Sequence, residues 1–444
     1  MNTQQRKVRS DQKQSDGPVA VSSRRRFLKY AAGLSVAPLL GGESSAAFEP
    51  GKGPIFGTPP LEGVKAIRKL AAVTTTYYQY SHADDIITRF FEGYTLVGKH
   101  HQPPCQVLGL YVDQLGDPGK DLSRDLANKH GCTIYPTIAE AVTLGGDRLA
   151  VDGVLHIVEQ GEYPFNEKGQ HLYPRKQFFD QIVEVFRRSG RTVPVYVDKH
   201  FSYDRAAAHE MYRTSRDLCF PMMAGSSVPV AWRRPPLELP IGVRLDSALA
   251  LAHGGIEAYG FHGLEALQCM VERRCGGETG VRAVQAFSGA QAWKAAHDGI
   301  WSRELLDAAL AVIPGNKKQP GNVEEVDHDA VVYVVEYRDG FRAATYMSRR
   351  FTGEFGFAAR ICGQTKPVAT WMELIKPERD HFSFLSANIE KMFVSGRPNY
   401  PVERTYLVTC VLAYLMDSLF EGGRRIETPD LAICYTPATD IYHG

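Results

Sequence analysis

The sequence predicts an α/β protein in which a parallel sheet with helices on both faces is followed by an open, mainly antiparallel sheet. Two patterns lead to this prediction. Up to about residue 218, β-rich apolar runs alternate with helical patterns, and from about residue 283 the β-rich runs follow one another directly. Parallel strands need a long, usually helical, connection, whereas antiparallel strands can be joined by a tight turn. The change in pattern therefore marks a change in sheet type.

The first part of the chain is expected to alternate strand and helix. Strands are predicted at the β-rich runs 64–73, 106–112, 151–158 and 192–197. Helices are predicted at 82–92, 122–129, 138–144, 174–189 and 205–218. A sheet of this type binds its ligands beyond the carboxyl ends of its strands, so polar residues that follow the strands are candidate site residues.

The second part is expected to be built from hairpins. Strands are predicted at 284–287, 331–337, 341–349, 353–361 and 368–374. The string Arg338-Asp339-Gly340 separates two of them, and an Asp-Gly turn between β-rich runs is a strong hairpin signal. Helices are predicted near 381–394 and 401–420, where the chain closes.

The first residues have the order of an export signal. Ser23-Arg24-Arg25-Arg26-Phe27-Leu28-Lys29 precedes a short apolar stretch, residues 30–40, and a patch of small residues ends at Ala47. This string resembles the signal read by the twin-arginine translocase, which carries folded cargo. We expect residues 1–47 to be a signal peptide and leader, and a periplasmic or otherwise extracytoplasmic location. The apolar stretch is too short to span a bilayer, so no stable membrane span is expected in the mature protein.

The amino-acid composition indicates which classes of binding partner are not favoured. With 51 basic and 50 acidic side chains, the formal charge is +1, so neither nucleic acid nor an anionic membrane is favoured as a partner. The eight cysteines are scattered without metal-site spacing and are expected to be free thiols. The roughly 400 residues after the leader are enough for two domains.

Two strings carry residues suited to proton transfer. In the first, Asp198-Lys199-His200 ends a predicted parallel strand, and partial desolvation at that edge can lower the pKa of a lysine. The alternative is a lysine without a catalytic role that only forms a salt bridge with Asp198. In the second, paired glycines lead into a helix on which His262 and Glu265 share a face. The alternative there is a buried structural histidine.

A metal site is a further possibility, without a fixed ligand motif. Carboxylates and imidazoles follow several predicted strands and could share the crevice. The candidate ligands are His156, Glu159, Glu162, Asp198, His200 and His262, with His82, His100 and His101 as weaker ones. Because no spacing matches a known ligand set, no metal is predicted.

In order and spacing, the two strings resemble motifs of the Gfo/Idh/MocA family of glucose-fructose oxidoreductases and inositol dehydrogenases. The family's Glu-Lys-Pro motif falls on residues 198–200, and its later Gly-Gly…His motif falls on 254–265, with Ala258 in place of an aspartate. The resemblance implies a Rossmann-like domain at 60–225 and an α/β domain with an open antiparallel sheet at 226–430. It also implies that the closing helix near 401–420 packs back on the first domain. It further implies the catalytic residues Lys199 and His262 and the substrate-binding residues Glu265, Arg233, Arg234 and Tyr259.

The resemblance also implies a nicotinamide cofactor, NAD or NADP. The residues that would bind it are Thr75, Thr76, Ser81, Asp113, Glu159, Asp198 and Lys199. The chain departs from the family at the first turn, where Thr74 to Ser81 replace a glycine-rich loop. Glycines let the backbone approach a pyrophosphate, whereas Asp84 and Asp85 in the first helical turn would repel one.

The preferred expectation is therefore an exported oxidoreductase that acts on a sugar, polyol or derivative, with a nicotinamide cofactor loaded before export. A carbohydrate lyase, isomerase or hydrolase without redox chemistry, metal-dependent or not, is the first alternative. A sugar-binding protein without catalysis is the second. Expected partners are a small carbohydrate-type substrate and the twin-arginine translocase. The family resemblance also implies a homo-oligomer formed through the exposed face of the second sheet.

Overall fold

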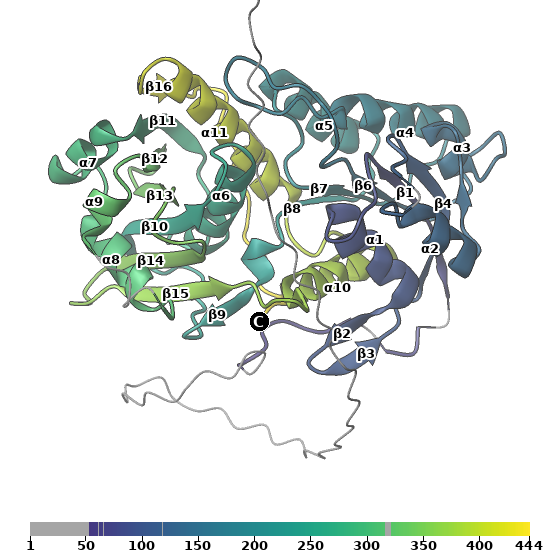
Figure 1. The fold of residues 1–444 in the computed structure, drawn as a ribbon, viewed down its shortest axis with the longest axis horizontal. Coiled ribbons are helices and arrows are strands. Elements are labelled where there is room, and N and C mark those ends of the chain that lie inside the picture. Colours follow the sequence, from purple (N-terminus) through teal and green to yellow (C-terminus); the bar gives the residue numbers. More distant parts are fainter. Residues whose placement is uncertain (1–52, 61, 65, 118, 316–320) are drawn as a thin grey trace, which may run out of the picture. The chain divides into compact units, whose positions relative to one another are not determined.

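A six-stranded parallel sheet forms one half of the protein (Figure 1). The computed structural model describes residues 53–60, 62–64, 66–117, 119–315 and 321–444, so the predicted leader at 1–47 lies outside the described residues. The strands, in spatial order, are β5 (Thr133–Ile134), β4 (Cys105–Val112), β1 (Arg68–Thr74), β6 (Gly153–Ile157), β7 (Val195–Asp198) and β8 (Met222–Gly225). All five pairings are parallel. This is the strand order of a Rossmann sheet, which confirms the first part of the fold prediction.

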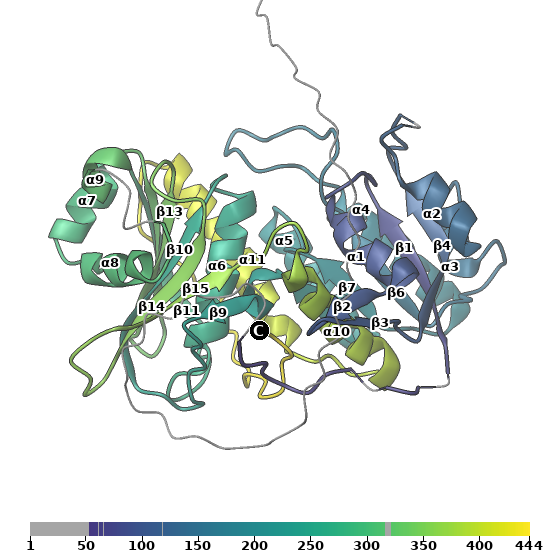
Figure 2. The same cartoon turned by 60° about the horizontal axis from the view of Figure 1, so that its bottom comes forward.

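Helices cover both faces of this sheet. They are α1 (His82–Glu92), α2 (Ser123–His130), α3 (Ile138–Thr143), α4 (Arg175–Ser189) and α5 (Arg205–Asp217). Side chains alternate along β1, so that Ala71 and Val73 face the core shared with α3, α4 and α5, and Leu70 and Ala72 face the core shared with α1. The second face is completed by α10 (Asp380–Ser395), a helix from much later in the chain (Figure 2).

An eight-stranded sheet forms the other half. In spatial order its strands are β16 (Ile426–Glu427), β11 (Val281–Ser288), β12 (Val331–Tyr337), β13 (Arg342–Ser348), β10 (Leu245–His253), β14 (Phe355–Ile361), β15 (Val368–Glu373) and β9 (Trp232–Arg234). Only the β10–β13 pairing is parallel. The Asp-Gly turn joins β12 to β13 as an antiparallel hairpin, as predicted. The described chain also contains a short hairpin, β2 (Tyr94–Leu96) with β3 (Lys99–His101).

Helices lie on both faces of the second sheet as well. Helices α6 (Ala258–Val271) and α11 (Val402–Phe420) pack on the face toward the parallel sheet. The opposite face is covered by α7 (Ala290–His297), α8 (Arg303–Ala311) and α9 (Val323–Val326), and Trp293 and Trp301 pack against its strands. The sheet face through which self-association was expected is therefore not exposed in this chain.

The sequence did not predict β10, the strand at the centre of the second sheet. Its residues, Leu245 to His253, are leucines, alanines and polar residues without a β-branched side chain, and such residues favour helix over strand. Burial between β13 and β14 overrides that preference. The other strand predictions agree with the structure, although β1 begins later than expected, at Arg68.

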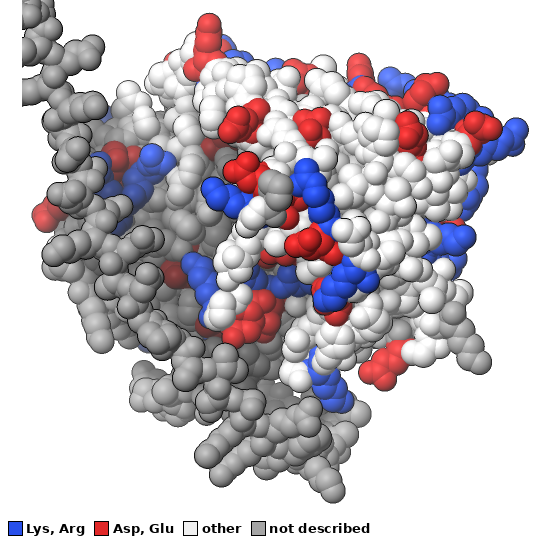
Figure 3. Space-filling view, turned by 45° about the vertical axis from the view of Figure 1, so that its right-hand side comes forward, with Lys and Arg blue, Asp and Glu red and all other residues white. Residues whose placement is uncertain are grey.

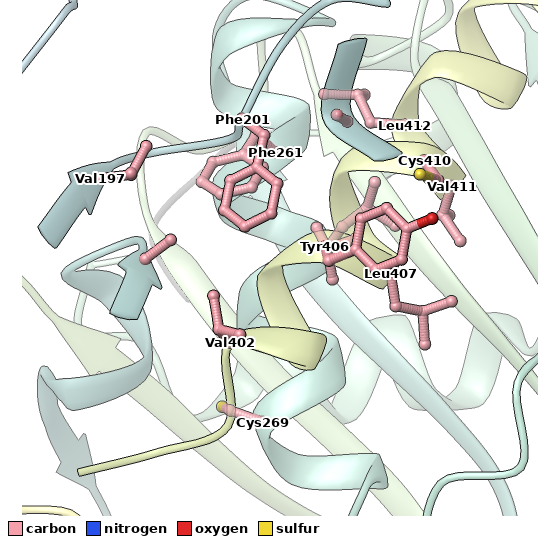
Figure 4. Packing of buried hydrophobic residues seen from close by; sticks show 14 of the residues in the cluster. Val197, Phe201, Phe261, Cys269, Val402, Tyr406, Leu407, Cys410, Val411 and Leu412 are labelled. Carbon is pink, nitrogen blue, oxygen red and sulfur yellow. The ribbon is translucent and has the colours of Figure 1, made fainter. Parts of the chain in front are cut away.

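One apolar core joins the two halves. Figure 4 shows Phe201, which follows β7, against Phe261 of α6, with Tyr406 and Leu407 of α11 beside them. Phe201 and Phe261 are both fully buried. This packing fixes α6 against the carboxyl ends of the parallel strands. Helix α11 also packs on α5 and β8, while the domain boundaries at 60–225 and 226–430 stay a prediction.

The described surface and cysteines agree with the composition. On the face shown in Figure 3, Lys and Arg are interspersed with Asp and Glu rather than gathered by sign. All eight cysteines are free, as expected. None of the helices in the described part of the chain combines the length and apolar character needed to cross a membrane.

Candidate functional site

The candidate site lies where the carboxyl ends of β1, β6, β7 and β8 meet α6 (Figure 1). Strands β1 and β6 are neighbours whose onward connections run to opposite sides of the sheet, and a crevice at such a point is the usual ligand site. Thr75, just after β1, donates its hydroxyl hydrogen to the main-chain oxygen of Glu159, just after β6, at 2.7 Å. Two predicted cofactor-binding residues are thus in contact with each other.

Lys199 leaves β7 in an unusual backbone conformation. Its φ is +61°, and its main-chain nitrogen donates to the oxygen of Gly225 at 3.1 Å. A side chain in the left-handed region costs about 1–2 kcal/mol, so the surrounding packing must hold it there. The lysine Nζ donates to Glu159 Oε1 at 2.7 Å, and the side chain is 6% exposed. Lys199 is therefore held as a buried ion pair.

Glu159 is a shared counter-ion. Its second oxygen pairs with Arg175, whose side chain is 1% exposed. Burial by itself would raise the pKa of Glu159, but the charges of Lys199 and Arg175 outweigh it and hold the pKa far below the usual range. The group is therefore a carboxylate at all ordinary pH values. It faces Lys199 rather than offering a free oxygen to a ligand.

His262 is a neutral imidazole. Its Nδ1 lies 2.6 Å from Ser226 Oγ, and its Nε2 has no hydrogen-bond partner among the described residues and is not buried. Burial and the nearby positive charge of Lys199 hold the pKa of His262 well below its ordinary value. An imidazole with one nitrogen anchored and the other accessible can exchange a proton or hydrogen-bond with a bound substrate.

Two consecutive residues connect Lys199 to His262. Gly225 accepts the main-chain hydrogen bond of Lys199, and the side chain of Ser226 holds His262. The amine and the imidazole, distant along the chain, therefore converge at the end of β8, within electrostatic reach of each other. Their roles in catalysis stay a prediction.

Asp198 does not pair with the adjacent Lys199. Its Oδ2 lies 2.7 Å from Nδ1 of His82, the first residue of α1. The ring of His82 faces that of His262, with centroids 6.4 Å apart and planes 26° from parallel. The alternative expectation of an Asp198–Lys199 salt bridge is therefore wrong. The two side chains leave the strand end in different directions, Asp198 toward His82 and Lys199 toward Glu159.

Glu265 lies beneath the site rather than in it. It is 1% exposed, and its Oε1 lies 2.9 Å from Thr405 Oγ1. A Cβ on Gly225 would lie 3.0 Å from Glu265 Oε2, so this carboxyl supports the chain that holds Lys199 and His262. Burial raises the pKa of Glu265 to about 7.

Arg233 and Arg234 also bind protein partners. Arg233 pairs with Glu238 and donates to the main-chain oxygen of Leu237, and Arg234 donates to Glu373 at 2.6 Å. Both side chains are at least 95% buried in β9, at the far edge of the second sheet. The structure does not bring them to His262, and substrate binding by them or by Glu265 stays a prediction.

Tyr259 lies next to His262, on the side of the imidazole that faces the solvent. The residue is 41% exposed, and its ring lies 5.9 Å from that of His262 and parallel to that of Phe355. An exposed aromatic face beside a polar group suits the apolar face of a sugar ring. Of the predicted substrate-binding residues, Tyr259 is the one that the structure places at the site.

The β1–α1 turn does not fit the pyrophosphate of a dinucleotide. A pyrophosphate in this fold binds the free amides at the start of the first helix. Here Ser81 Oγ accepts from the amide of Asp84, Gln160 accepts from that of His82 at 2.9 Å, and Tyr80 donates to Asp84. These amides have internal partners, and two acidic residues, Asp84 and Asp85, lie in the same turn. Ser81 is therefore the N-cap of α1.

A pocket of about 730 Å³ opens next to this turn, between it and the loop after β4. Thr76 lines it, and its charged lining residues are three aspartates, Asp84, Asp117 and Asp121, and one lysine, Lys120. Asp113, the residue predicted to bind the adenosine ribose, accepts hydrogen bonds from Tyr111 at 2.9 Å and Tyr163 at 2.6 Å. The pocket offers volume, but its charge does not favour phosphate.

No group of three or more His, Cys, Asp or Glu side chains is placed to hold a metal ion in the part of the chain that the structure describes. The candidate ligands point to other partners. His156 Nε2 contacts the main-chain oxygen of Arg175, His200 pairs with Glu257, and His101 pairs with Glu390.

Sequence reasoning missed the partners that organise the site. Arg175 is the first residue of α4, Gln160 follows Glu159, and Ser226 follows β8. Ser81 and His82 offered the only usable signal, because a capping serine places the next residue at the helix start. Nothing local indicates that His82 meets Asp198, 116 residues away.

Comparisons with known proteins agree with the fold. Neither a protein-family model nor a curated protein matches the sequence. Among solved structures, the chain is similar to GenD2 from gentamicin A biosynthesis in complex with NAD, with 13% identity, a TM-score of 0.53, and coverage of 84% of this chain and 99% of that one. It is also similar to myo-inositol dehydrogenase from Lactobacillus casei in complex with NAD(H) and myo-inositol, with 10% identity, a TM-score of 0.51, and coverage of 82% and 97%.

A third similar structure is myo-inositol 2-dehydrogenase from Lactobacillus plantarum, with 10% identity, a TM-score of 0.50, and coverage of 81% of this chain and 99% of that one. The matches span nearly all of each neighbour, so both sheets and their connection are shared. The chain therefore has the two-part fold of the Gfo/Idh/MocA-type dehydrogenases.

Proposed function

We propose that this protein is an exported oxidoreductase that acts on a sugar, a polyol or a derivative of one. The observation that carries the proposal is the convergence of Lys199 and His262 at the ligand-binding edge of this fold, with an accessible Nε2 on a neutral imidazole. Lys199 and the imidazole of His262 bind the reacting hydroxyl group, and Tyr259 covers the sugar ring.

The fold supports a nicotinamide cofactor, NAD or NADP, since two similar proteins were determined with NAD or NAD(H). Such a cofactor would supply the hydride acceptor and would have to be loaded before export. The turn after β1 does not fit its pyrophosphate, however, because the amides of α1 are bonded internally. We therefore assign roles only to the residues that would bind the substrate or transfer protons.

The same turn favours a second candidate, an acid/base lyase or isomerase that needs no dinucleotide. The site holds an ammonium group and two facing imidazoles, His82 and His262, which suit proton transfer at the carbon next to a carbonyl. In this candidate the dehydrogenase fold carries a reaction without hydride transfer, as one fold can host several chemistries.

One set of measurements separates the two candidates. The chain from Phe48 onward is purified from cytosol, denatured and examined by mass spectrometry for NAD and NADP. It is then incubated with myo-inositol, common hexoses and their keto derivatives in D₂O, with and without added NAD and NADP. Bound nicotinamide and NAD(P)H formation support the oxidoreductase. Deuterium incorporation into substrate carbon without NAD(P)H formation supports the lyase or isomerase. If neither signal is detected, both candidates are contradicted.

Two variants tie the activity to the site. Lys199→Met and His262→Asn should each lower kcat/KM by about 100-fold or more, the usual contribution of a group that stabilises charge developing on the reacting oxygen. His130→Asn is the matched control, because His130 sits on α2 and pairs with Glu92 at the surface.

Export through the twin-arginine pathway to the periplasm, or otherwise outside the cytoplasm, is part of the proposal. The Ser23–Lys29 string supports it. Residues 1–50 fused to a fluorescent protein that matures only in the cytoplasm should deliver a fluorescent product outside it, and replacing Arg24 and Arg25 by lysine should stop delivery. Export of the lysine variant at the wild-type level would contradict the assignment. A homo-oligomer is proposed as well, through a surface other than the covered sheet face, and light scattering tests it.

A further inference from the structure

His82 is anchored more firmly than a surface histidine. Its Nδ1 lies 2.7 Å from Asp198 Oδ2, and the two side chains are 12% and 2% exposed. Its main-chain amide donates to Gln160 at 2.9 Å, and the ring of Phe382 packs perpendicular to its ring, with the centroids 5.5 Å apart. The backbone and one ring nitrogen are therefore held by hydrogen bonds, and the ring packs against Phe382.

The hydrogen-bond partners of His82 and His262 favour different tautomers, with the hydrogen on a different ring nitrogen in each. A carboxylate only accepts hydrogen bonds, so Asp198 requires the hydrogen of neutral His82 on Nδ1, which leaves Nε2 with a free lone pair. Ser226 Oγ already accepts from the amide of Val228 at 3.0 Å, so its own hydrogen is available to His262 Nδ1. When the hydroxyl donates to Nδ1, His262 carries its hydrogen on Nε2 and acts as a donor there.

Neither Nε2 atom has a hydrogen-bond partner among the described residues, and neither is buried. The rings face each other at 6.4 Å. One of these nitrogens can therefore accept a proton while the other donates a hydrogen bond into the same space. The charged and titratable groups around His82 are Asp198, Asp85, Glu159, His262 and His381.

The turn that departs from the dinucleotide-binding pattern is what places His82. Ser81 caps α1 and Gln160 binds the next amide, so the side chain of the first helical residue is directed onto Asp198. A glycine-rich turn that held a pyrophosphate here would need those same amides to be free.

We propose that His82, oriented by Asp198, is the proton acceptor of the candidate site, and that His262 is its hydrogen-bond donor. The substrate O–H bond breaks, the proton forms a bond to His82 Nε2, and both electrons stay on the substrate oxygen, which Lys199 and the His262 N–H stabilise. Asp198 stabilises the imidazolium that forms and is a positioning residue. This assignment deepens the proposed function and rests on it, but it holds whether or not hydride transfer follows.

The first test needs no substrate. Nitrogen-15 spectra of histidine-labelled chain from Phe48 onward should show His82 with its hydrogen on Nδ1 and His262 with its hydrogen on Nε2, assigned with His82→Gln and His262→Asn. In Asp198→Asn the amide can donate to Nδ1, so His82 should change to the Nε2–H form. A wild-type His82 that carries its hydrogen on Nε2 would overturn the proposal.

The second test uses diethyl pyrocarbonate, which acylates an accessible imidazole nitrogen that carries a lone pair. Peptide mapping should show His82 modified at least 10-fold faster than the fully buried His156 and His200, and slowed at least 10-fold by Asp198→Asn. Equal rates for His82 in wild type and Asp198→Asn would count against the positioning role.

The third test uses the compound in the sugar and polyol panel that the wild-type chain converts. His82→Gln and Asp198→Asn should each lower kcat by 100-fold or more with little change in KM, and His209→Gln, on α5 and bonded to Tyr406, should leave kcat unchanged. A His82→Gln chain as active as wild type overturns this inference alone. A wild-type chain that converts nothing in the panel overturns the proposed function, and the inference falls with it.

Discussion

At the scale of single residues, Glu159 neutralises two buried cations, Lys199 and Arg175, whose side chains are 6% and 1% exposed. Glu159→Gln keeps the shape of the side chain but removes its charge, which leaves two cations without their counter-ion. Breaking a buried ion pair on one side costs about 3–5 kcal/mol. We expect urea unfolding to show a loss of stability of about that size.

Glu92→Gln is the control for this measurement. Glu92 also has two basic partners, Lys129 and His130, but it is 36% exposed, so water already screens it. Its loss should change the free energy of unfolding by less than about 1 kcal/mol. Equal effects of the two substitutions would show that burial of the Glu159 charge contributes nothing.

A second residue-scale prediction concerns pH. Burial raises the pKa of Glu265 to about 7, above the ordinary value of 4.5 for a glutamate. Between these two values the folded chain keeps a proton that the unfolded chain loses, so this group contributes stability below about pH 4.5 that is lost as the pH rises to about 7. The slope approaches about 1.4 kcal/mol per pH unit within the window.

Glu265→Gln stays neutral at every pH and should remove that slope. The measurement compares urea midpoints of wild type and Glu265→Gln at several pH values between about 5 and 7. The difference between the two proteins should change steadily in favour of the variant as the pH rises. A constant difference would mean that Glu265 is ionised in the folded protein.

At the scale of elements, β8 ends against α6 and α11 at Gly225, which has a φ of +134°. A Cβ there would lie 2.8 Å from Thr405 Oγ1 and 3.0 Å from Glu265 Oε2. Gly225→Ala should therefore destabilise the protein by about 1–3 kcal/mol through overpacking, in addition to backbone strain. Because Gly225 accepts the main-chain hydrogen bond of Lys199, kcat should fall as well.

Gly242→Ala separates the two contributions. Gly242 also has a positive φ, +82°, but a Cβ there would meet nothing within 4 Å. Its substitution should cost only the backbone strain of about 1 kcal/mol. Thermal unfolding of both variants gives the comparison, and equal shifts in Tm would exclude the clash at β8.

At the scale of the whole molecule, the parallel sheet depends on a helix from the end of the chain. Leu385, Ile389 and Phe393 of α10 belong to the same apolar core as β1 and α1. A Cβ on Gly153 of β6 would lie 2.5 Å from Phe393, which shows how closely α10 packs on the sheet. Without α10 this sheet face would expose a large apolar surface to water.

We therefore expect residues 53–225 expressed alone to lack a cooperative thermal transition and to bind the dye ANS. Residues 53–444 should unfold cooperatively and bind little dye. A fragment 53–225 with a sharp transition would show that the parallel-sheet half is stable without α10.

The sequence alone determined most of the elements and their order. Alternation of strand and helix and the Asp-Gly turn are local patterns, and both were found where they were predicted. The longest strand that was not predicted is β10, whose leucines and alanines carry no strand signal, because its conformation depends on the neighbouring strands. Strands β8 and β9 and helices α7, α8 and α9 were not predicted either. Lys199 was found at the end of a strand for the same local reason.

The tertiary structure decided which of these residues meet. Glu159 pairs with Lys199 from 40 residues away, and His82 pairs with Asp198 from 116 residues away. Such pairs depend on which strands lie side by side and on where each connection crosses the sheet, and no pattern within a few residues encodes that. The sequence therefore identified an ammonium and an imidazole suited to proton transfer, while the fold supplied their counter-ion, the second imidazole and the internal bonds that occupy the phosphate position.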